Sequence, residues 1–192
     1  MTEGVAETQV PDREAEIARL REMIAHLEER VRVLDELAHQ DPLMALPNRR
    51  GFMRELESAI ARVSRYGESA AMLFIDIDGL KNINDSFGHK AGDDALIHVA
   101  SALSQGVRKS DYVARIGGDE FGILLVHSDE ANARDTANRL TAQIESDESD
   151  CDGNKLGLGI AIGITMIAPN DTPDAVIGRA DRAMYLDKSS AA

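Results

Sequence analysis

The sequence has little of several features that mark broad classes of protein. It contains one cysteine, Cys151, and its 21 Lys and Arg residues stand against 34 Asp and Glu, which gives a formal net charge of −13 at pH 7. A single cysteine excludes an internal disulfide and a zinc cluster built on cysteines. The acidic balance argues against a broad phosphate-tracking surface, so we expect no nucleic-acid partner and expect any bound phosphate to be held locally.

Long apolar runs are also absent. The continuous apolar run at residues 70–75 is far short of the roughly 20 residues that a membrane-spanning helix needs, so we expect no membrane span. Residues 1–12 have neither the basic flank nor the apolar centre of a signal peptide, and we assign them to a disordered N-terminus. We therefore expect a soluble, cytoplasmic protein, which the single cysteine also favours.

The sequence does contain enough apolar material for one folded domain. Its 192 residues are 43% hydrophobic and 29% charged, which leaves room for one domain plus a short appendage. Pro42 marks a boundary, because its ring removes a backbone donor and disfavours helical geometry in the residue before it. We predict a coiled-coil helix over residues 13–40 and a folded domain over residues 41–192.

The helix predicted at residues 13–40 carries apolar residues spaced alternately by three and four. Such a heptad seam faces a partner helix. β-branched residues at one seam position with Leu at the other favour a coiled coil of two parallel helices. The alternative is an amphipathic helix packed on its own domain. We expect a homodimer through this helix, on which a separate regulatory protein can act. The seam consists of Ile17, Leu20, Ile24, Leu27, Val31, Leu34 and Ala38.

The domain combines helices with strands. Residues 117–120 join two apolar runs as the turn of a hairpin does. Helices alternating with strands, and this hairpin in the middle, favour an α/β (α+β) fold with a mixed sheet covered by helices. Helices are predicted at 48–66, 93–105, 129–145 and from 172 onward, strands at 70–77, 112–116, 121–126 and 156–167, and an acidic loop at 145–152.

Acidic residues stand out by their position at two places, one of which is a strand end where a charge is costly. Asp76 and Asp78 end the predicted buried strand, and Asp119 and Glu120 lie in the hairpin turn. Carboxylates at the ends of neighbouring strands form an oxygen site suited to Mg²⁺, which in turn handles phosphates. The alternative for the turn is an ordinary polar connection.

Several motifs, in order, resemble one known family. Residues 115–121, RIGGDEF, are similar to the signature of the GGDEF diguanylate cyclases. Residues 76–93 resemble that family's first metal and guanine-binding segment, residues 41–50 its opening motif and residues 180–188 its last helix. The resemblance covers residues 36–188.

The resemblance implies both a fold and a reaction. The fold is an adenylate-cyclase-like palm, with a mixed central sheet of about five strands flanked by helices and the GGDEF hairpin at the edge of the active site. The reaction condenses two GTP molecules, one on each subunit, into cyclic di-GMP and two pyrophosphates. Mg²⁺ or Mn²⁺ is the implied cofactor.

The resemblance also assigns roles to single residues. Asp76 and Asp119 hold the metal with the carbonyl of Ile77, and Asp119 and Glu120 are catalytic, with Glu120 helping to activate the nucleophile. Asn84 and Asp93 bind guanine, whose N1–H and amino group can donate to a carboxylate in a way that adenine cannot match. The remaining substrate contacts are Lys81, Lys188, Gly117 and Gly118.

A second ligand site is implied upstream of the signature. Arg108 and Asp111 match the family's RxxD motif, at which the product cyclic di-GMP inhibits the enzyme. The chain departs from the family at Met44-Ala45, where Thr-Gly is usual. It also has Ala192 where the family often has an arginine that contacts phosphate, which predicts reduced affinity for the triphosphate.

Two other functions remain open. Residues 76–79 also fit the start of a haloacid-dehalogenase-type phosphatase with Asp76 as nucleophile, although that family has Thr where Leu80 stands. The other alternative is a binding module: a catalytically silent GGDEF receptor or adaptor for GTP or cyclic di-GMP. A receptor has no need of the complete acidic site formed by Asp76, Asp119 and Glu120.

Overall fold

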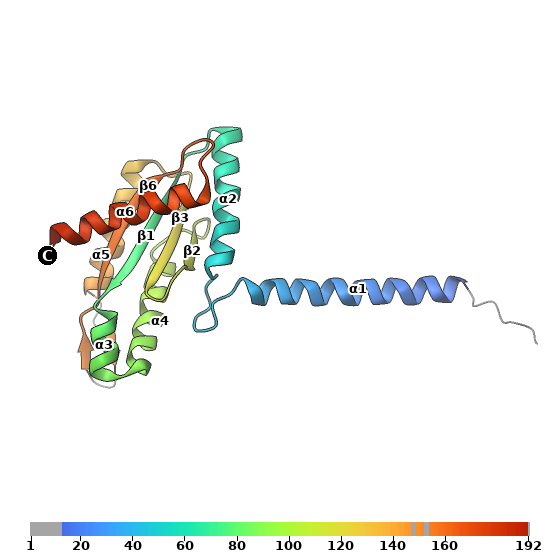
Figure 1. The fold of residues 1–192 in the computed structure, drawn as a ribbon, viewed down its shortest axis with the longest axis horizontal. Coiled ribbons are helices and arrows are strands. Elements are labelled where there is room, and N and C mark those ends of the chain that lie inside the picture. Colours follow the sequence, from blue (N-terminus) through green and yellow to red (C-terminus); the bar gives the residue numbers. More distant parts are fainter. Residues whose placement is uncertain (1–12, 147–148, 152–153, 192) are drawn as a thin grey trace, which may run out of the picture. The chain divides into compact units, whose positions relative to one another are not determined.

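A computed structural model describes residues 13–146, 149–151 and 154–191. The N-terminus that we predicted to be disordered, residues 1–12, lies outside these residues. The chain divides after Ala38 into two compact units. The first contains helix α1 (Arg13–Ala38) and the second contains all other helices and strands (Figure 1).

Helix α1 has an uncovered apolar face. Its large apolar side chains are between 40% and 67% exposed, which is unusual for Leu, Ile and Val. The pairing of this helix in a coiled coil stays a prediction. No helix in the described ranges has both the length and the apolar character needed to cross a membrane.

The core of the second unit is a four-stranded sheet. Its strands are β1 (Ala70–Asp78), β2 (Tyr112–Arg115), β3 (Glu120–Val126) and β6 (Gly159–Met166), in the order β2-β3-β1-β6. The predicted α+β class is confirmed, with two differences in detail. The sheet has four strands where we expected about five, and every pairing of neighbours is antiparallel where we expected a mixed sheet. The reason is that the helical crossover after β1 places β2 beyond β3, so strands that run the same way are not neighbours.

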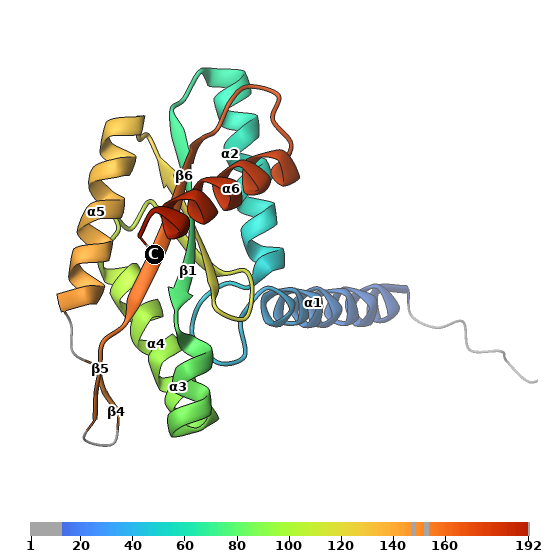
Figure 2. The same ribbon diagram turned by 60° about the vertical axis from the view of Figure 1, so that its left-hand side comes forward.

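Helices cover both faces of the sheet (Figure 2). Apolar residues of α4 (His89–Gln105) and α5 (Glu130–Ser146) form one core with one face of β1, and α2 (Arg49–Tyr66) and α6 (Pro173–Ala191) form a second core on the other face. Strand β1 is therefore buried on both sides, which explains its continuous apolar sequence. As predicted, the side chain of Asn48 caps α2, accepting from the backbone amides of Arg50 and Gly51.

Three local predictions need correction. Helix α3 (Leu80–Phe87) lies where we expected a loop, because it is short and buries only Leu80 and Ile83, too few for a periodic signal. Helix α4 therefore begins earlier than predicted. The predicted acidic loop contains strand β4 (Ser149–Cys151), which pairs with β5 (Asn154–Leu156), so that the strand predicted at 156–167 is divided between β5 and β6.

Candidate active site

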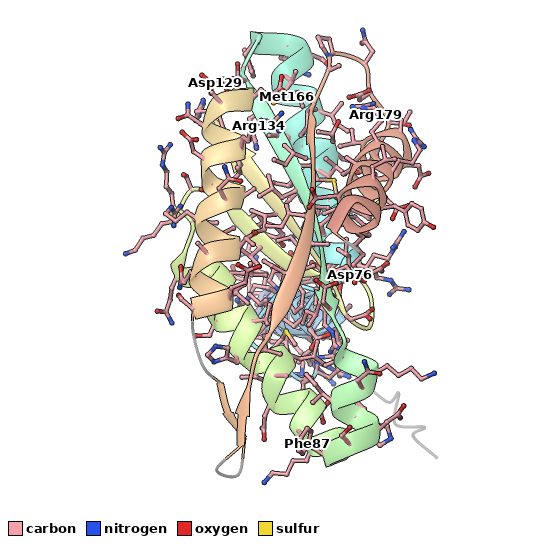
Figure 3. All side chains as sticks on the ribbon, turned by 90° about the vertical axis from the view of Figure 1, so that its left-hand side faces the viewer. Asp76, Phe87, Asp129, Arg134, Met166 and Arg179 are labelled. Carbon is pink, nitrogen blue, oxygen red and sulfur yellow. The ribbon has the colours of Figure 1, made fainter. Side chains whose placement is uncertain are left out.

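The pairing of β1 with β3 gathers the acidic residues. Asp76 lies directly opposite Glu120 in the antiparallel register, so both side chains project from the same face of the sheet. One residue further on, the amide of Ile77 donates to the carbonyl of Asp119 at 3.1 Å. The predicted metal and catalytic residues therefore meet at one end of two central strands, and Figure 3 shows Asp76 at this end of the sheet.

The signature turn is fixed by its own backbone and by the opening loop. The amides of Ile116 and Gly117 donate to the carbonyl of Glu120 at 2.9 and 3.2 Å. The guanidinium of Arg115 donates to the carbonyl of Gly118 at 2.7 Å and pairs with Asp41 at 3.3 Å. The Asp41 and Arg115 side chains are 10% and 15% exposed. Both residues belong to motifs of the resemblance that assigned them no role, and the structure shows that together they position the turn.

The two glycines of the turn serve different purposes. A β-carbon on Gly117 would lie 2.0 Å from Oε2 of Glu120, so the glycine leaves room for this carboxylate to lie against the turn. A β-carbon on Gly118 would meet no atom of the chain within 4 Å. The open space at Gly118 is therefore available to a ligand.

Burial and like charges raise the proton affinity of the two facing acids. Burial raises the pKa of Asp76, and so do the charges of Asp119 and Asp78, whereas hydrogen bonding to Lys188 opposes the shift. The pKa of Glu120 is raised by burial first and then by the charges of Asp119 and Asp76. The site thus holds more negative charge than its own groups compensate.

The donor set fits a hard divalent cation. Asp76 and Asp119 offer carboxylate oxygens, the type of ligand that Mg²⁺ prefers, and their excess charge favours a bound cation. Within the described residues no three acidic, His or Cys side chains gather into a complete metal cage. Mg²⁺ is usually bound by one or two carboxylates together with substrate phosphates, and Asp76 and Asp119 offer two such carboxylates.

Lys188 already brings one positive charge to these acids. Its Nζ pairs with Oδ2 of Asp76, and it lies 3.1 Å from Oδ1 of Asp78. We predicted that Lys188 contacts the triphosphate. The structure places its amine at the same end of the sheet, but on the carboxylates.

A pocket of about 400 Å³ adjoins the signature turn. Its walls come from α3, α4 and the turn, and they include five predicted site residues: Lys81, Asn84, Asp93, Gly118 and Asp119. A β-carbon on Gly92 would lie 2.1 Å from Oδ1 of Asn84, so this glycine lets Asn84 lie against α4. Asp119 lines the pocket and also belongs to the acidic end of the sheet, and it therefore joins the two groups of predicted residues.

A separate cavity of about 300 Å³ contains both residues of the RxxD motif, Arg108 and Asp111. The carboxylate of Asp111 accepts from the amides of Arg108 at 3.0 Å and Val126 at 3.3 Å, which fixes the loop. Arg139 on α5 lines the same cavity. Sequence reasoning missed Arg139, because it belongs to no local motif and only the fold brings it to the loop.

Fold and site together define an α+β palm domain whose acidic edge adjoins a pocket. Residues 38–192 match the family described as "Diguanylate cyclase, GGDEF domain". The chain therefore belongs to the GGDEF family. This membership removes the dehalogenase-type phosphatase as an alternative.

Individual relatives agree with the family match. The sequence is 39% identical over 169 residues to the diguanylate cyclase TpbB of Pseudomonas aeruginosa. The matched region covers 87% of this chain and 39% of that relative. The chain thus spans about two fifths of that relative's length. The crystal structure of the coiled coil and GGDEF domain of DgcB from Caulobacter crescentus, in complex with c-di-GMP, superposes with a TM-score of 0.83 at 26% identity, covering 92% of this chain and 94% of that one. The crystal structure of the diguanylate cyclase SiaD in complex with its activator SiaC, from Pseudomonas aeruginosa, superposes with a TM-score of 0.78 at 28% identity. This match covers 93% of this chain and 69% of that one.

Proposed function

We propose that this chain is a diguanylate cyclase, which condenses two GTP molecules into cyclic di-GMP and two pyrophosphates across a dimer of GGDEF domains. The observation that carries the proposal is the position of Asp119. It lines the pocket that holds Asn84 and Asp93, and it lies beside the facing pair of Asp76 and Glu120. One residue thus connects a place for the base with a place for the reacting phosphate.

Recognition of the base rests on α3 and α4. Asn84 and Asp93 offer an amide and a carboxylate to the guanine edge, and a carboxylate acceptor selects guanine over adenine. Lys81 lines the same pocket, where its amine neutralises part of the triphosphate. The open side of Gly118 lets the nucleotide approach the backbone of the turn.

The reaction joins two half-sites. The 3′-oxygen of one GTP forms a bond to the α-phosphorus of the GTP on the partner domain, the bond from that phosphorus to the bridging oxygen breaks, and pyrophosphate leaves. Glu120, whose pKa is raised by burial and by its acidic neighbours, accepts the proton of the 3′-hydroxyl. Repeating the step in the other half-site closes the ring.

Asp76, Asp119 and the carbonyl of Ile77 would hold the metal, Mg²⁺ or Mn²⁺. When bound, the metal supplies positive charge to the phosphate oxygens. The chain's own residues orient the two nucleotides, and the pairing of β1 with β3 keeps Asp76 opposite Glu120. Lys188 completes the set as a contact to the triphosphate.

Dimerisation through α1 is part of the proposal. Each domain holds one nucleotide, so activity needs a second domain, and pairing two α1 helices raises its effective concentration. The exposed seam supports this assignment, as does the likeness to a structure that contains a coiled coil. A separate regulatory protein acting on residues 13–40 would control activity by changing how the helices pair.

The decisive experiment is incubation of the purified protein with GTP and Mg²⁺, with products identified by chromatography and mass. We expect cyclic di-GMP and pyrophosphate, and none from Asp119→Ala. If no product forms after bound cyclic di-GMP has been removed, at concentrations high enough for dimers, the chain is a receptor or adaptor, or a cyclase that stays inactive without its regulatory partner.

The role of α1 is tested by Ile24→Glu with Leu27→Glu, which places charge in the seam. Dilution should lower the specific activity of this variant at protein concentrations where the wild type stays dimeric, and sedimentation should show monomers. Ala25→Glu with His26→Glu is the matched control, because it adds charge to the same turn of the helix outside the seam. Undiminished specific activity of a monomeric seam variant would disprove the dimer mechanism.

Product inhibition is proposed for the cavity that holds Arg108, Asp111 and Arg139. Arginine binds phosphate or a guanine edge with two parallel hydrogen bonds, and the cavity brings two such groups together. Arg108→Ala should keep the initial rate but continue to make product at cyclic di-GMP concentrations that stop the wild type. If progress curves of the two proteins level off together, the inhibition site is elsewhere or absent.

A further inference from the structure

The ion pair between α6 and β1 joins one lysine to two carboxylates, whereas a simple structural salt bridge needs only one. Lys188 reaches two carboxylates, those of Asp76 and Asp78, and Asp76 also faces Glu120. The side chain of Asp76 is 16% exposed, whereas those of Lys188 and Asp78 are 34% and 49% exposed. The amine thus joins a mostly buried acid to one at the surface.

An ionised Asp76 favours a cation beside it even when no ligand is present. A carboxylate at the end of a buried strand loses much of its hydration, and an ionised group in such a place is costly unless it is paired. The neighbouring charges of Asp119 and Asp78 add to this cost. In the chain by itself, Lys188 is the residue that offsets it, through its hydrogen bond to Asp76.

The position of α6 holds Lys188 at this place. A β-carbon on Gly163 of β6 would lie 2.0 Å from the carbonyl of Ala180 and 2.3 Å from the amide of Met184, so the helix backbone rests directly on the strand. Met184, one turn before Lys188, is buried in the core. A cavity of about 460 Å³ lined by Lys188, Asp78 and Ala161 lies beside the amine and gives the side chain room to move.

We infer that Lys188 is an internal counter-ion, which occupies the cation position at Asp76 until metal and nucleotide arrive, and that Asp78 retains the displaced amine beside the incoming triphosphate. The inference rests on the proposed function, because Asp76 is the metal ligand there. A metal ion that arrives alone must displace the amine from Asp76, which weakens its binding. A metal ion that arrives with GTP also brings phosphates, which give the displaced amine a new partner.

The first test measures the affinity for Mn²⁺ alone, without nucleotide, from the paramagnetic resonance signal of the free ion. Lys188→Met removes the competing amine and should bind Mn²⁺ about tenfold more tightly than the wild type. Arg182→Met is the matched control, because it removes the same charge from an exposed position on the same helix. It should stay within about twofold of the wild type. Equal affinities for the Lys188 and Arg182 variants would overturn the inference.

This test separates the inference from the proposed function. If the wild type makes cyclic di-GMP but Lys188→Met does not tighten Mn²⁺ binding, only the counter-ion role is wrong. If Mn²⁺ binding tightens but the wild type makes no cyclic di-GMP, the counter-ion role stands and the cyclase proposal loses its support. Circular dichroism melts in metal-free buffer check that each variant is folded, and Lys188→Gln replaces Lys188→Met if the latter is not.

The role of Asp78 is tested with a GTP analogue that has a methylene bridge between the α- and β-phosphorus and therefore cannot release pyrophosphate. Binding of its Mg²⁺ complex is measured for the wild type, Asp78→Asn, Lys188→Met and the double variant. Because Asp78 acts through Lys188, the Asp78→Asn substitution should weaken binding about threefold more in the wild type than in the Lys188→Met background. Equal effects in the two backgrounds would show that Asp78 does not retain the amine.

Discussion

The two ends of α6 carry ion pairs of opposite character. Near its first turns, Arg179 holds Asp171 by two parallel hydrogen bonds of 2.6 and 2.9 Å and donates to the carbonyl of Met166 at 3.1 Å. The hydrogen bond from Arg179 lowers the pKa of Asp171. In the last turn, Lys188 is shared between Asp76 and a second acid, and the pKa of Asp76 is raised.

This difference separates charges that stabilise the fold from charges that await a ligand. One arginine on one carboxylate leaves no charge uncompensated, and the pair ties the helix to the preceding loop. One lysine among several acids leaves the site negative, so an added cation is favourable. Figure 3 shows Arg179 and Met166 toward one end of the sheet and Asp76 toward the other, so the two kinds of site lie apart along α6.

The largest expected effect is at the ligand end. Asp119→Ala removes a carboxylate from the metal and should lower the rate of cyclic di-GMP formation by roughly 10³-fold or more. Because it also removes a like charge beside Asp76 and Glu120, its unfolding midpoint should equal or exceed that of the wild type. Initial rates and thermal melts on the same preparation check both statements. A large loss of stability would mean that the acids support the fold.

The converse effect is expected at the other end. Asp171→Asn keeps the shape of the side chain but removes the charge that Arg179 holds, and should cost about 2 kcal/mol of the unfolding free energy. For a domain of this size that is a fall of roughly 4–8 °C in the melting midpoint. Activity per folded molecule should be unchanged when assayed well below that temperature. Lost activity without lost stability would contradict the division between the two ends.

A substitution away from both ends tests the nucleotide pocket alone. Gly92→Ala would push Asn84 away from α4, and we expect GTP to bind about tenfold more weakly through the lost guanine contact. The thermal unfolding midpoint of the domain should stay close to that of the wild type. Gly157→Ala is the control, since a β-carbon there would meet no atom within 4 Å. Titration of the methylene-bridged GTP analogue against both variants measures the difference.

The smallest effect is the pH dependence of stability. The lowered pKa of Asp171 gives stability that is present above its ordinary value of 3.8 and is lost as the pH falls through the folded-state pKa. The raised pKa of Glu120 acts in the other direction: its charge costs stability at neutral pH, and acidification toward its ordinary value of 4.5 relieves that cost. Glu120→Gln should therefore melt roughly 1–2 °C above the wild type at pH 7. This difference should vanish below pH 4.5 in melts across the range.

Much of the fold was predictable because local sequence signals define most of its helices and strands. The cap at Asn48 and the apolar face that follows define α2, and the unbroken apolar run of β1 indicates burial on both faces. Helix α3 was missed because eight residues with two buried side chains carry almost no periodic signal. The strand order was not predictable either, because it depends on where the crossover after β1 returns to the sheet.

The site divides in the same way. Asp76 stood out because a carboxylate is costly at the end of a buried strand, whereas Asp119 and Glu120 were identified by the signature motif. The ion pair of Asp41 with Arg115 spans 74 residues, and no local pattern reports it. The residues next to Lys188 in the sequence likewise do not indicate whether its amine contacts phosphate or carboxylate.

The pairing of Lys188 with Asp76 also has a consequence for the order in which the molecule is made. The two residues are 112 positions apart, with the signature hairpin and α5 between them. Contacts between residues so distant in sequence form late, after local hairpins and helices. On a ribosome the strand end and the turn therefore emerge and pair first, and their acids wait without a counter-ion until the last helix docks. Until α6 docks, the acidic edge therefore lacks the positive charge that Lys188 supplies in the folded domain.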